Sequence, residues 1–290
     1  MTRIVNTLSE ISQNYDALFC DLWGCLHDGI APFAEAEEAL IGFRAKGGKV
    51  VLLTNAPRSR YEVEGQLAQM GVRRECWDTI ATSGDSARLA MFRGAVGTRV
   101  LHIGEPRDIP FFDPIKLLDP CPIVERVTLD DAEGIVCTGP YDPDADLDDL
   151  RPELLVSKEK GLKILCANPD IVVDRGDRRE WCAGAIAQIY SEMGGESLYF
   201  GKPHPPVYEL ARRRLMELDP TISDHKILAV GDGVVTDVIG AIGENLDVLF
   251  VTGGLAAAET ETKSEPNPKA LERYLSDQQV SPTFAIGKLR

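Results

Sequence analysis

The sequence lacks an apolar run near the ~18 residues that a membrane-spanning helix requires, and it has no low-complexity tract. Its first ten residues contain no apolar segment of the kind found in secretion signals. Positive charge is scarce too, because 31 Lys and Arg stand against 46 Asp and Glu, a formal net charge of −15. This charge disfavours binding to nucleic acids and to anionic membranes. We therefore expect a cytoplasmic globular protein with no nucleic-acid or membrane partner.

Paired cysteines are absent as well. The seven cysteines form no C-x-x-C motif and their number is odd, which disfavours both a zinc site and a disulfide framework. Most of them lie in apolar segments and are expected in the core. Cys20 and Cys25 flank Asp21, so a redox role for these two stays open.

The most informative segment is 17–29. Ala17–Cys20 has the length and composition of a buried strand, and Asp21 follows it directly. Open parallel α/β sheets bind ligands at the carboxyl ends of their strands. A carboxylate at such a position can act as a covalent nucleophile or bind a cation, although an aspartate can also simply turn the chain.

The order of the predicted elements indicates a parallel sheet. A helix expected from Pro32 to Gly47 separates the first strand from a second one, 49–55, and a further helix follows from Pro57 to Gly71. This βαβα order favours right-handed crossovers between parallel strands. Two more apolar strands are predicted near the carboxyl end, at 226–232 and 247–251.

The pattern changes in the middle of the chain, where short predicted strands alternate with a proline-rich segment and an acidic connector. We interpret this part as an inserted α/β unit with a core of its own. The predicted fold class is α/β, with a Rossmann-like parallel-sheet core formed by 1–88 and 196–290 and an inserted cap domain formed by 89–195.

Polar residues stand at the ends of four predicted segments: Asp21, Thr54 with Asn55, Lys202, and Asp232 with Asp237. If the strands are parallel, these residues meet at one edge of the sheet. Their chemistry is complementary, because Asp21 can attack phosphorus while Thr54 and Asn55 donate hydrogen bonds to phosphoryl oxygens. Lys202 can offset the negative charge shared by the nucleophile and the phosphoryl group.

Asp232 and Asp237 complete the pattern. Carboxylates are the ligands that the hard cation Mg²⁺ prefers, and Mg²⁺ also bridges to phosphate. The sequence therefore predicts a magnesium-assisted phosphoryl-transfer site.

This arrangement resembles the haloacid dehalogenase superfamily over nearly the whole chain. Four motifs carry the resemblance: Phe19–Gly24, Leu53–Asn55, Gly201–Pro203 and Gly231–Asp237. The inserted unit, with the segments 81–84, 167–170 and 201–205, is similar to the class IIA branch, which includes p-nitrophenyl phosphatases and nucleotidase-like hydrolases.

The resemblance implies a Rossmann-like core with a large α/β cap, dependence on Mg²⁺, and an aspartyl-phosphate intermediate on Asp21. It implies that Mg²⁺ is held by Asp21, Asp232, Asp237 and the backbone carbonyl of Trp23. The implied activity is hydrolysis of a small phosphorylated metabolite.

One position departs from the family pattern. Phosphatases of the superfamily carry a second aspartate two residues after the nucleophile, and this chain has Trp23 there. That aspartate protonates the leaving alcohol and then activates water, a contribution typically worth ~10²–10⁴-fold in rate. An indole can do neither, so the reaction is expected to be slow unless His27 or Asp28 takes over.

Two alternatives stay open. Dehalogenases of the superfamily also lack the second aspartate, but they need no Mg²⁺ and usually carry their cap after the first motif. The other alternative is a catalytically impaired fold that binds a phosphorylated ligand or a protein partner.

The remaining predictions concern the substrate. Asn168 and Asp170, at the end of a predicted cap strand, and His204, next to Lys202, are candidate substrate contacts. The identity of the metabolite depends on cap loops, which a single sequence does not reveal. A homo-oligomer also stays open, because a cap of this kind offers a surface for it.

Overall fold

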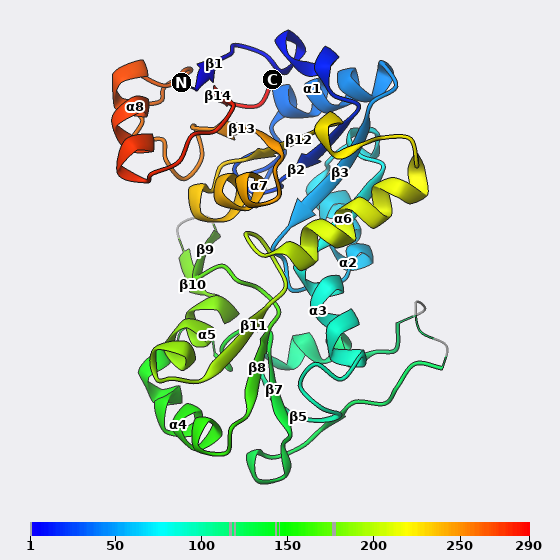
Figure 1. Cartoon of the computed structure of the whole chain (residues 1–290), viewed down its shortest axis with the longest axis vertical. Coiled ribbons are helices and arrows are strands. Elements are labelled where there is room, and N and C mark those ends of the chain that lie inside the picture. Colours follow the sequence, from blue (N-terminus) through cyan, green and yellow to red (C-terminus); the bar gives the residue numbers. More distant parts are fainter. Residues whose placement is uncertain (1, 116–117, 119, 143, 145, 176–177) are drawn as a thin grey trace. The chain divides into compact units, whose positions relative to one another are not determined.

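The computed structural model describes residues 2–115, 118, 120–142, 144, 146–175 and 178–290. The chain divides into two compact units (Figure 1). The first consists of Met1–Thr54, Glu64–Ala81 and Tyr208–Arg290, and the second of Asn55–Val63 and Thr82–Val207. The stretch predicted as a cap, 89–195, lies within the second unit, and its role as a cap stays a prediction.

The first unit is built on a seven-stranded sheet. In spatial order its strands are β1 (Arg3–Ile4), β14 (Phe284–Ile286), β13 (Asp247–Val251), β12 (Ile227–Gly231), β2 (Ala17–Cys20), β3 (Lys49–Thr54) and β4 (Thr79–Thr82). Every pairing from β1 to β3 is parallel. The residues of β2 and β12 are all buried, as expected for strands covered on both faces.

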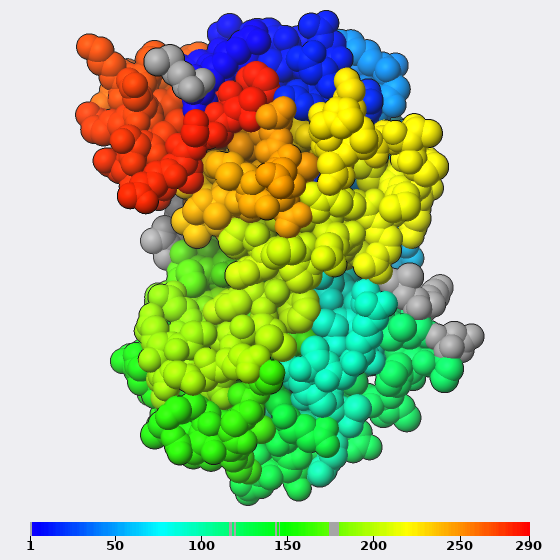
Figure 2. Space-filling view, in the orientation of Figure 1, coloured from blue at the N-terminus to red at the C-terminus, as the bar shows by residue number. Residues whose placement is uncertain are grey.

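The edge of this sheet joins the two ends of the chain. Arg3 and Ile4 pair with Phe284 and Ala285. The backbone N–H of Leu8 also donates to the carbonyl of Arg290 at 2.7 Å. Figure 2 accordingly shows the blue N-terminal and red C-terminal segments packed side by side.

The second unit has a five-stranded parallel sheet with the spatial order β11 (Glu196–Tyr199), β8 (Lys163–Cys166), β7 (Gly134–Cys137), β5 (Arg99–Ile103) and β6 (Glu125–Arg126). Helices α4 (Arg151–Glu159) and α5 (Ala183–Glu192) pack on one core cluster of this sheet. Helix α3 (Ser83–Phe92) packs on the other cluster. An antiparallel hairpin, β9 (Val172–Arg175) and β10 (Arg178–Trp181), stands apart from this sheet.

The remaining helices complete the architecture. They are α1 (Ala34–Ala45), α2 (Arg60–Met70), α6 (Pro205–Leu218), α7 (Ile239–Gly243) and α8 (Pro268–Asp277). Short 3₁₀ turns are η1 (Leu8–Glu10), η2 (Ser12–Asn14), η3 (Arg74–Cys76), η4 (Pro106–Phe112), η5 (Leu129–Asp131), η6 (Leu147–Leu150) and η7 (Asp224–Lys226), and η8 (Val234–Val238) is a π-helical turn. Within the described residues, none of these helices has both the length and the apolar character to cross a bilayer.

The predicted fold class, parallel α/β with an inserted α/β unit, is confirmed. The sequence did not indicate β1 or the β9–β10 hairpin. The first of these is two residues long, and an alternation pattern needs about four residues to stand out. It was also not evident that the helix after Asp232 begins with a π-helical turn.

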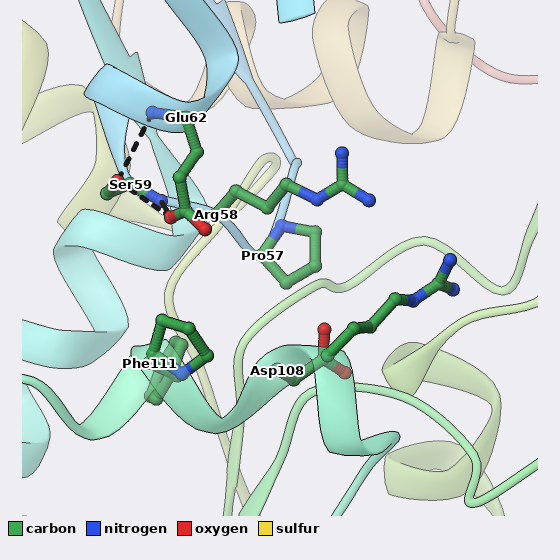
Figure 3. A pocket seen from close by; sticks show the side chains of 8 residues that line it. Pro57, Arg58, Ser59, Glu62, Asp108 and Phe111 are labelled. Atoms are coloured by element: carbon green, nitrogen blue, oxygen red, sulfur yellow. Dashed lines mark hydrogen bonds between the residues drawn. The ribbon is translucent and has the colours of Figure 1, made fainter. Parts of the chain in front are cut away.

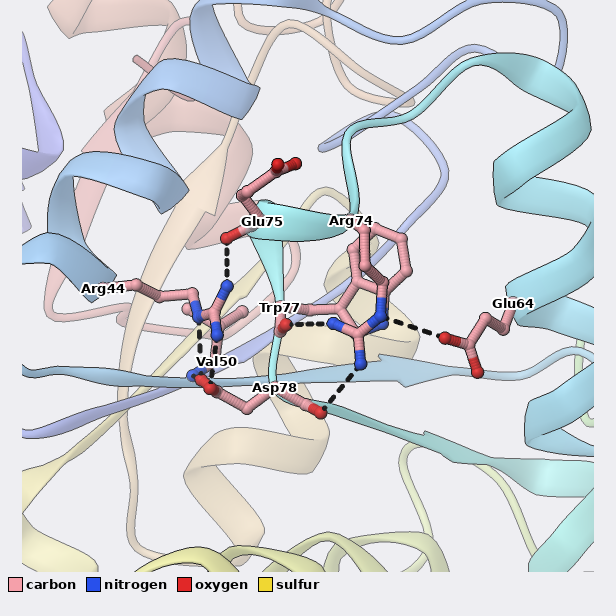
Figure 4. A network of polar contacts seen from close by, with 7 residues as sticks. All are labelled: Arg44, Val50, Glu64, Arg74, Glu75, Trp77 and Asp78. Atoms are coloured by element: carbon pink, nitrogen blue, oxygen red, sulfur yellow. Dashed lines mark hydrogen bonds and ion pairs between the residues drawn. The ribbon is translucent and has the colours of Figure 1, made fainter.

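A polar network ties the sheet of the first unit to α1 (Figure 4). The Asp78 carboxylate accepts from Arg44 Nε at 3.0 Å, from Arg44 Nη2 at 2.6 Å and from the backbone N–H of Val50 at 2.8 Å. Arg44 also donates to the Glu75 carbonyl. On the other side of this segment, Arg74 donates to the carbonyl of Trp77 at 2.6 Å. Asp78 thus holds the end of α1 against the start of β3.

We predict that Asp78→Ala lowers the free energy of unfolding by about 2 kcal/mol, because it removes two hydrogen bonds of the Arg44 guanidinium and leaves the Val50 N–H without its acceptor. Urea unfolding of the purified protein measures this change. Glu64→Ala is the matched control, since the Arg74–Glu64 pair is half exposed on both sides and should contribute less than about 1 kcal/mol. Equal losses in the two variants would contradict this account of the network.

Candidate active site

Three neighbouring strands of the first unit end in polar residues. In the order β12–β2–β3, Asp232 follows the first strand, Asp21 follows the second, and Thr54 ends the third. Because these strands are parallel, the three residues share one edge of the sheet, as predicted. The Asp21 backbone N–H donates to the Val230 carbonyl at 2.8 Å, which continues the β2–β12 pairing to the strand end. All three side chains are buried.

Close backbone packing surrounds the Asp232 carboxylate. A Cβ placed on Gly24, which has a φ of +70°, would lie 2.0 Å from Asp232 Oδ2. A Cβ on Gly254 would lie 2.0 Å from the same oxygen. Oδ2 also accepts the backbone N–H of Leu255 at 3.0 Å. Glycine at positions 24 and 254 therefore leaves the space that the Asp232 carboxylate occupies.

Asp237 lies in the π-helical turn η8, a feature that often accompanies functional sites. Its Oδ2 accepts the Gly233 N–H at 3.1 Å and the Thr236 hydroxyl at 3.3 Å. A Cβ on Gly231 would lie 2.1 Å from Asp237 Cγ. The two glycines of the Gly231-Asp232-Gly233 segment thus allow Asp237 to approach the strand end.

Ligand atoms of Asp21, Cys25 and Asp232 all lie within 4.8 Å of one another. Burial, reinforced by the Asp232 and Asp21 carboxylates, raises the pKa of the Cys25 thiol well above its usual range. Cys25 therefore stays a neutral thiol, and the charged donors of the group are carboxylates. Oxygen donors of this kind fit a hard divalent cation such as Mg²⁺.

The loop after Asp21 packs around the Trp23 indole. The rings of Trp23 and His27 meet edge to face, with centroids 5.3 Å apart. A Cβ on Gly29, whose φ is +86°, would lie 2.2 Å from the indole. The Gly24 N–H donates to the His27 carbonyl at 3.0 Å and closes the loop. Trp23 therefore helps to pack this loop.

The two residues that could replace the missing acid, His27 and Asp28, are both deprotonated at neutral pH. Burial lowers the pKa of His27 to about 4, and its Nδ1 accepts the Gly29 N–H at 3.0 Å. The Asp28 carboxylate accepts from the N–H groups of Ala31 and Ile30, which lower its pKa. His27 is thus a neutral imidazole and Asp28 an ionised carboxylate, which weakens the alternative that either one replaces the missing acid.

The second unit brings together a further set of predicted residues. Asn55 Oδ1 accepts the Lys202 backbone N–H at 2.7 Å, and Asn55 Nδ2 donates to the Lys202 carbonyl at 3.1 Å. Nδ2 also donates to Asp170 Oδ1 at 2.8 Å. The side chains of Asn55 and Lys202 are almost fully buried. The motifs around Asn55 and Lys202, far apart in sequence, are therefore in direct contact.

The other candidate substrate contacts lie close to this set in sequence. Asn168 Oδ1 accepts the Asp170 N–H at 3.0 Å and so stabilises the turn after β8. The His204 ring stacks on Tyr199 with centroids 4.8 Å apart, and burial lowers its pKa. The roles of these residues in binding substrate stay predictions.

A pocket of about 230 Å³ in the second unit was not anticipated from the sequence (Figure 3). Its lining residues are Pro57, Arg58, Ser59, Glu62, Arg107, Asp108, Pro110 and Phe111. The Glu62 carboxylate accepts from the Ser59 N–H at 2.9 Å and from the Ser59 hydroxyl at 2.7 Å, a capping box at the start of α2. The Ser-x-x-Glu pattern at 59–62 could have indicated this helix start, but no local pattern indicates that η4 forms the opposite wall.

Comparison with known proteins places the chain in a family. Residues 18–113 match the haloacid dehalogenase-like hydrolase family, and residues 199–277 match the HAD-hydrolase-like family. A haloacid dehalogenase-like hydrolase from Brucella suis is 37% identical in sequence. The similarity covers 99% of this chain and 100% of that one, with a TM-score of 0.85.

The chain belongs to the haloacid dehalogenase-like hydrolase family. A D-glycerol 3-phosphate phosphatase from Mycobacterium tuberculosis is 25% identical over 263 residues, which cover 89% of this chain and 69% of that protein. The structure of a p-nitrophenyl phosphatase from Archaeoglobus fulgidus has the same fold, with a TM-score of 0.70, 18% identity, and coverage of 94% of this chain and 96% of that one. The predicted relation to class IIA hydrolases is thereby confirmed.

We predict that Gly254→Ala weakens binding of a divalent cation to this haloacid dehalogenase-like hydrolase by ~10-fold or more, because the new Cβ must displace the Asp232 carboxylate. Titration with Mg²⁺ by calorimetry, or with Mn²⁺ by electron paramagnetic resonance, measures the affinity.

Gly243→Ala is the matched control for this experiment, because a Cβ at Gly243 meets no atom within 4 Å. Unchanged cation affinity in a folded Gly254→Ala protein would contradict a role for Asp232 as ligand.

Proposed function

We propose that this hydrolase is a Mg²⁺-dependent phosphomonoesterase that acts on a small phosphorylated metabolite. The observation that carries the proposal is the meeting of the Asp21 and Asp232 carboxylates, within 4.8 Å, at the ends of adjacent parallel strands. The phosphatase activities named for the Mycobacterium tuberculosis and Archaeoglobus fulgidus relatives support the same reaction class.

In the proposed reaction, a carboxylate oxygen of Asp21 attacks the phosphorus atom, and the bond from phosphorus to the ester oxygen breaks. The leaving group departs as its alkoxide, or as the phenolate of an aryl ester, and takes a proton from water, while an aspartyl-phosphate remains on Asp21. Water then attacks this phosphorus, the bond to the Asp21 oxygen breaks, and inorganic phosphate is released with the carboxylate restored. Water is the only other reactant, and no oxidant or reductant is needed.

Mg²⁺ would be held by Asp21, Asp232, Asp237 and the backbone carbonyl of Trp23, and when bound it would supply positive charge to the phosphoryl oxygens. Thr54 is proposed to donate its hydroxyl hydrogen bond to a phosphoryl oxygen. Lys202 is proposed to offset the negative charge that builds up on the phosphoryl group.

Asn55 is also proposed to contribute to phosphate binding. Its side-chain amide already pairs with the Lys202 backbone and Asp170, which favours its backbone N–H for this role.

The leaving group must depart without a strong acid. Trp23 stands where other phosphatases of the family carry an aspartate, His27 is neutral, and Asp28 is ionised. We therefore propose that esters of acidic alcohols, such as aryl phosphates, are better substrates than alkyl or sugar phosphates. The presence of Trp23 in place of an aspartate also favours a second candidate function, binding of a phosphorylated ligand without turnover.

We predict that the wild-type protein releases p-nitrophenol from p-nitrophenyl phosphate, that EDTA abolishes the release, and that added Mg²⁺ restores it. Asp21→Asn removes the nucleophile at nearly constant shape and should abolish turnover. The release is followed by absorbance. Metal-dependent phosphate binding with no turnover in the wild type would instead establish the second candidate function.

We further predict that Trp23→Asp raises the rate on an alkyl phosphate by ~10²-fold, because it restores a general acid, while the rate on p-nitrophenyl phosphate rises much less. Trp23→Asn is the matched control, since it makes the same loss of packing but carries no acidic proton. If both variants accelerate the alkyl substrate equally, the missing proton is not what limits the wild-type reaction.

A further inference from the structure

The Asn55 side chain makes a two-point contact with the backbone of one residue. Its oxygen accepts the Lys202 N–H at 2.7 Å, and its nitrogen donates to the Lys202 carbonyl at 3.1 Å. An amide side chain that meets both groups of a residue restrains that residue as a paired strand would. The contact spans 147 positions of sequence, and both partners lie in the second unit.

Close contacts also leave no space for a side chain at Gly201, next to Asn55, or at Gly184, next to Pro169. A Cβ on Gly201 would lie 2.5 Å from Asn55 Oδ1 and 2.6 Å from Pro169 Cδ. A Cβ on Gly184 would lie 2.1 Å from the Pro169 carbonyl oxygen. The segments after β3, β8 and β11 therefore converge on Asn55 at distances that only glycine permits.

Asp170 sets the direction in which the Asn55 amide points. The Asn55 nitrogen carries the amide hydrogens, and it donates to Asp170 Oδ1 at 2.8 Å. The Asn55 oxygen is then the atom that meets the Lys202 N–H. Asp170 is in turn held by Asn168, whose Oδ1 accepts the Asp170 N–H at 3.0 Å.

We propose that Asn168, Asp170 and Asn55 are positioning residues that act in series on the backbone of Lys202. This inference rests on the proposed function, in which the Lys202 amine offsets phosphoryl charge. Lys202 is 2% exposed, so a displacement of its backbone would move a closely packed side chain. Asn168 and Asp170, predicted as substrate contacts, act in this account through Asn55.

The experiment is a double-mutant cycle on p-nitrophenyl phosphate hydrolysis with Mg²⁺ present. Asn55→Ala and Asp170→Ala are each expected to lower kcat by ~10²-fold, the typical effect of a displacement near 1 Å. The double variant is expected to lose little more than either single variant, because both changes remove the same restraint. Asp170→Asn keeps an acceptor oxygen and is expected to recover most of the activity.

Two results would overturn the proposal. If the losses multiply in the double variant, the two residues act independently. If Asp170→Ala reorders the preference between aryl and alkyl phosphates, or raises KM with kcat unchanged, Asp170 contacts the substrate itself. Thermal unfolding of each variant separates these results from loss of the fold.

A second measurement keeps this inference separate from the proposed function. The Lys202 amide proton is hydrogen-bonded to Asn55, so hydrogen exchange at Lys202 is expected to accelerate in Asn55→Ala and in Asp170→Ala but not in Asp170→Asn. This readout needs no turnover. If the wild type hydrolyses no phosphomonoester, the proposed function fails, but hydrogen exchange still tests whether Asp170 and Asn55 restrain the Lys202 backbone. Unchanged exchange at Lys202 in Asp170→Ala would overturn that inference.

Discussion

Two buried carboxylates, Asp21 and Asp232, lie within a few ångströms of each other at the ends of adjacent parallel strands. Like charges at this separation repel strongly in a poorly solvated environment. The rest of the first unit enforces the arrangement. The β2–β12 pairing sets the spacing of the two strand ends, and the absence of a Cβ at Gly24 and Gly254 leaves room for the Asp232 carboxylate. The divalent cation proposed for this site would add positive charge beside the two carboxylates.

Trp23 contributes packing, and no acidic group, to the loop that follows Asp21. The Trp23 indole packs against His27 and over Gly29, and burial lowers the pKa of His27 to about 4. The family position that ordinarily carries an acid contributes packing here. In the proposed reaction, Asp21 and the proposed cation ligands keep their roles, while the leaving group departs without a protein acid. The proposed preference for esters of acidic alcohols depends on this loss of the acid and not on the identity of the metabolite.

In the second unit, a series of buried hydrogen bonds fixes the backbone of Lys202. Hydrogen bonds from Asp170 through Asn55 reach the backbone of Lys202, and the glycines around them allow the segments to approach closely. Buried polar groups of this type are costly unless each is hydrogen-bonded, so the set has few alternative arrangements. A lysine held in this way can present its charge with little reorganisation, which is what electrostatic stabilisation of a phosphoryl group requires.

The sequence by itself determined the parallel α/β fold, the family, and the polar residues at the strand ends. Buried parallel strands are short apolar runs, and the residue that ends each run, such as Asp21, Thr54 or Asp232, is visible without a structure. Only the tertiary structure decided that the Asn55 side chain hydrogen-bonds to the backbone of Lys202, 147 positions away. It also decided that burial lowers the pKa of His27 and that η4 faces the start of α2 across a pocket. These features depend on contacts between distant segments and on burial, and neither leaves a periodic or local pattern in the chain.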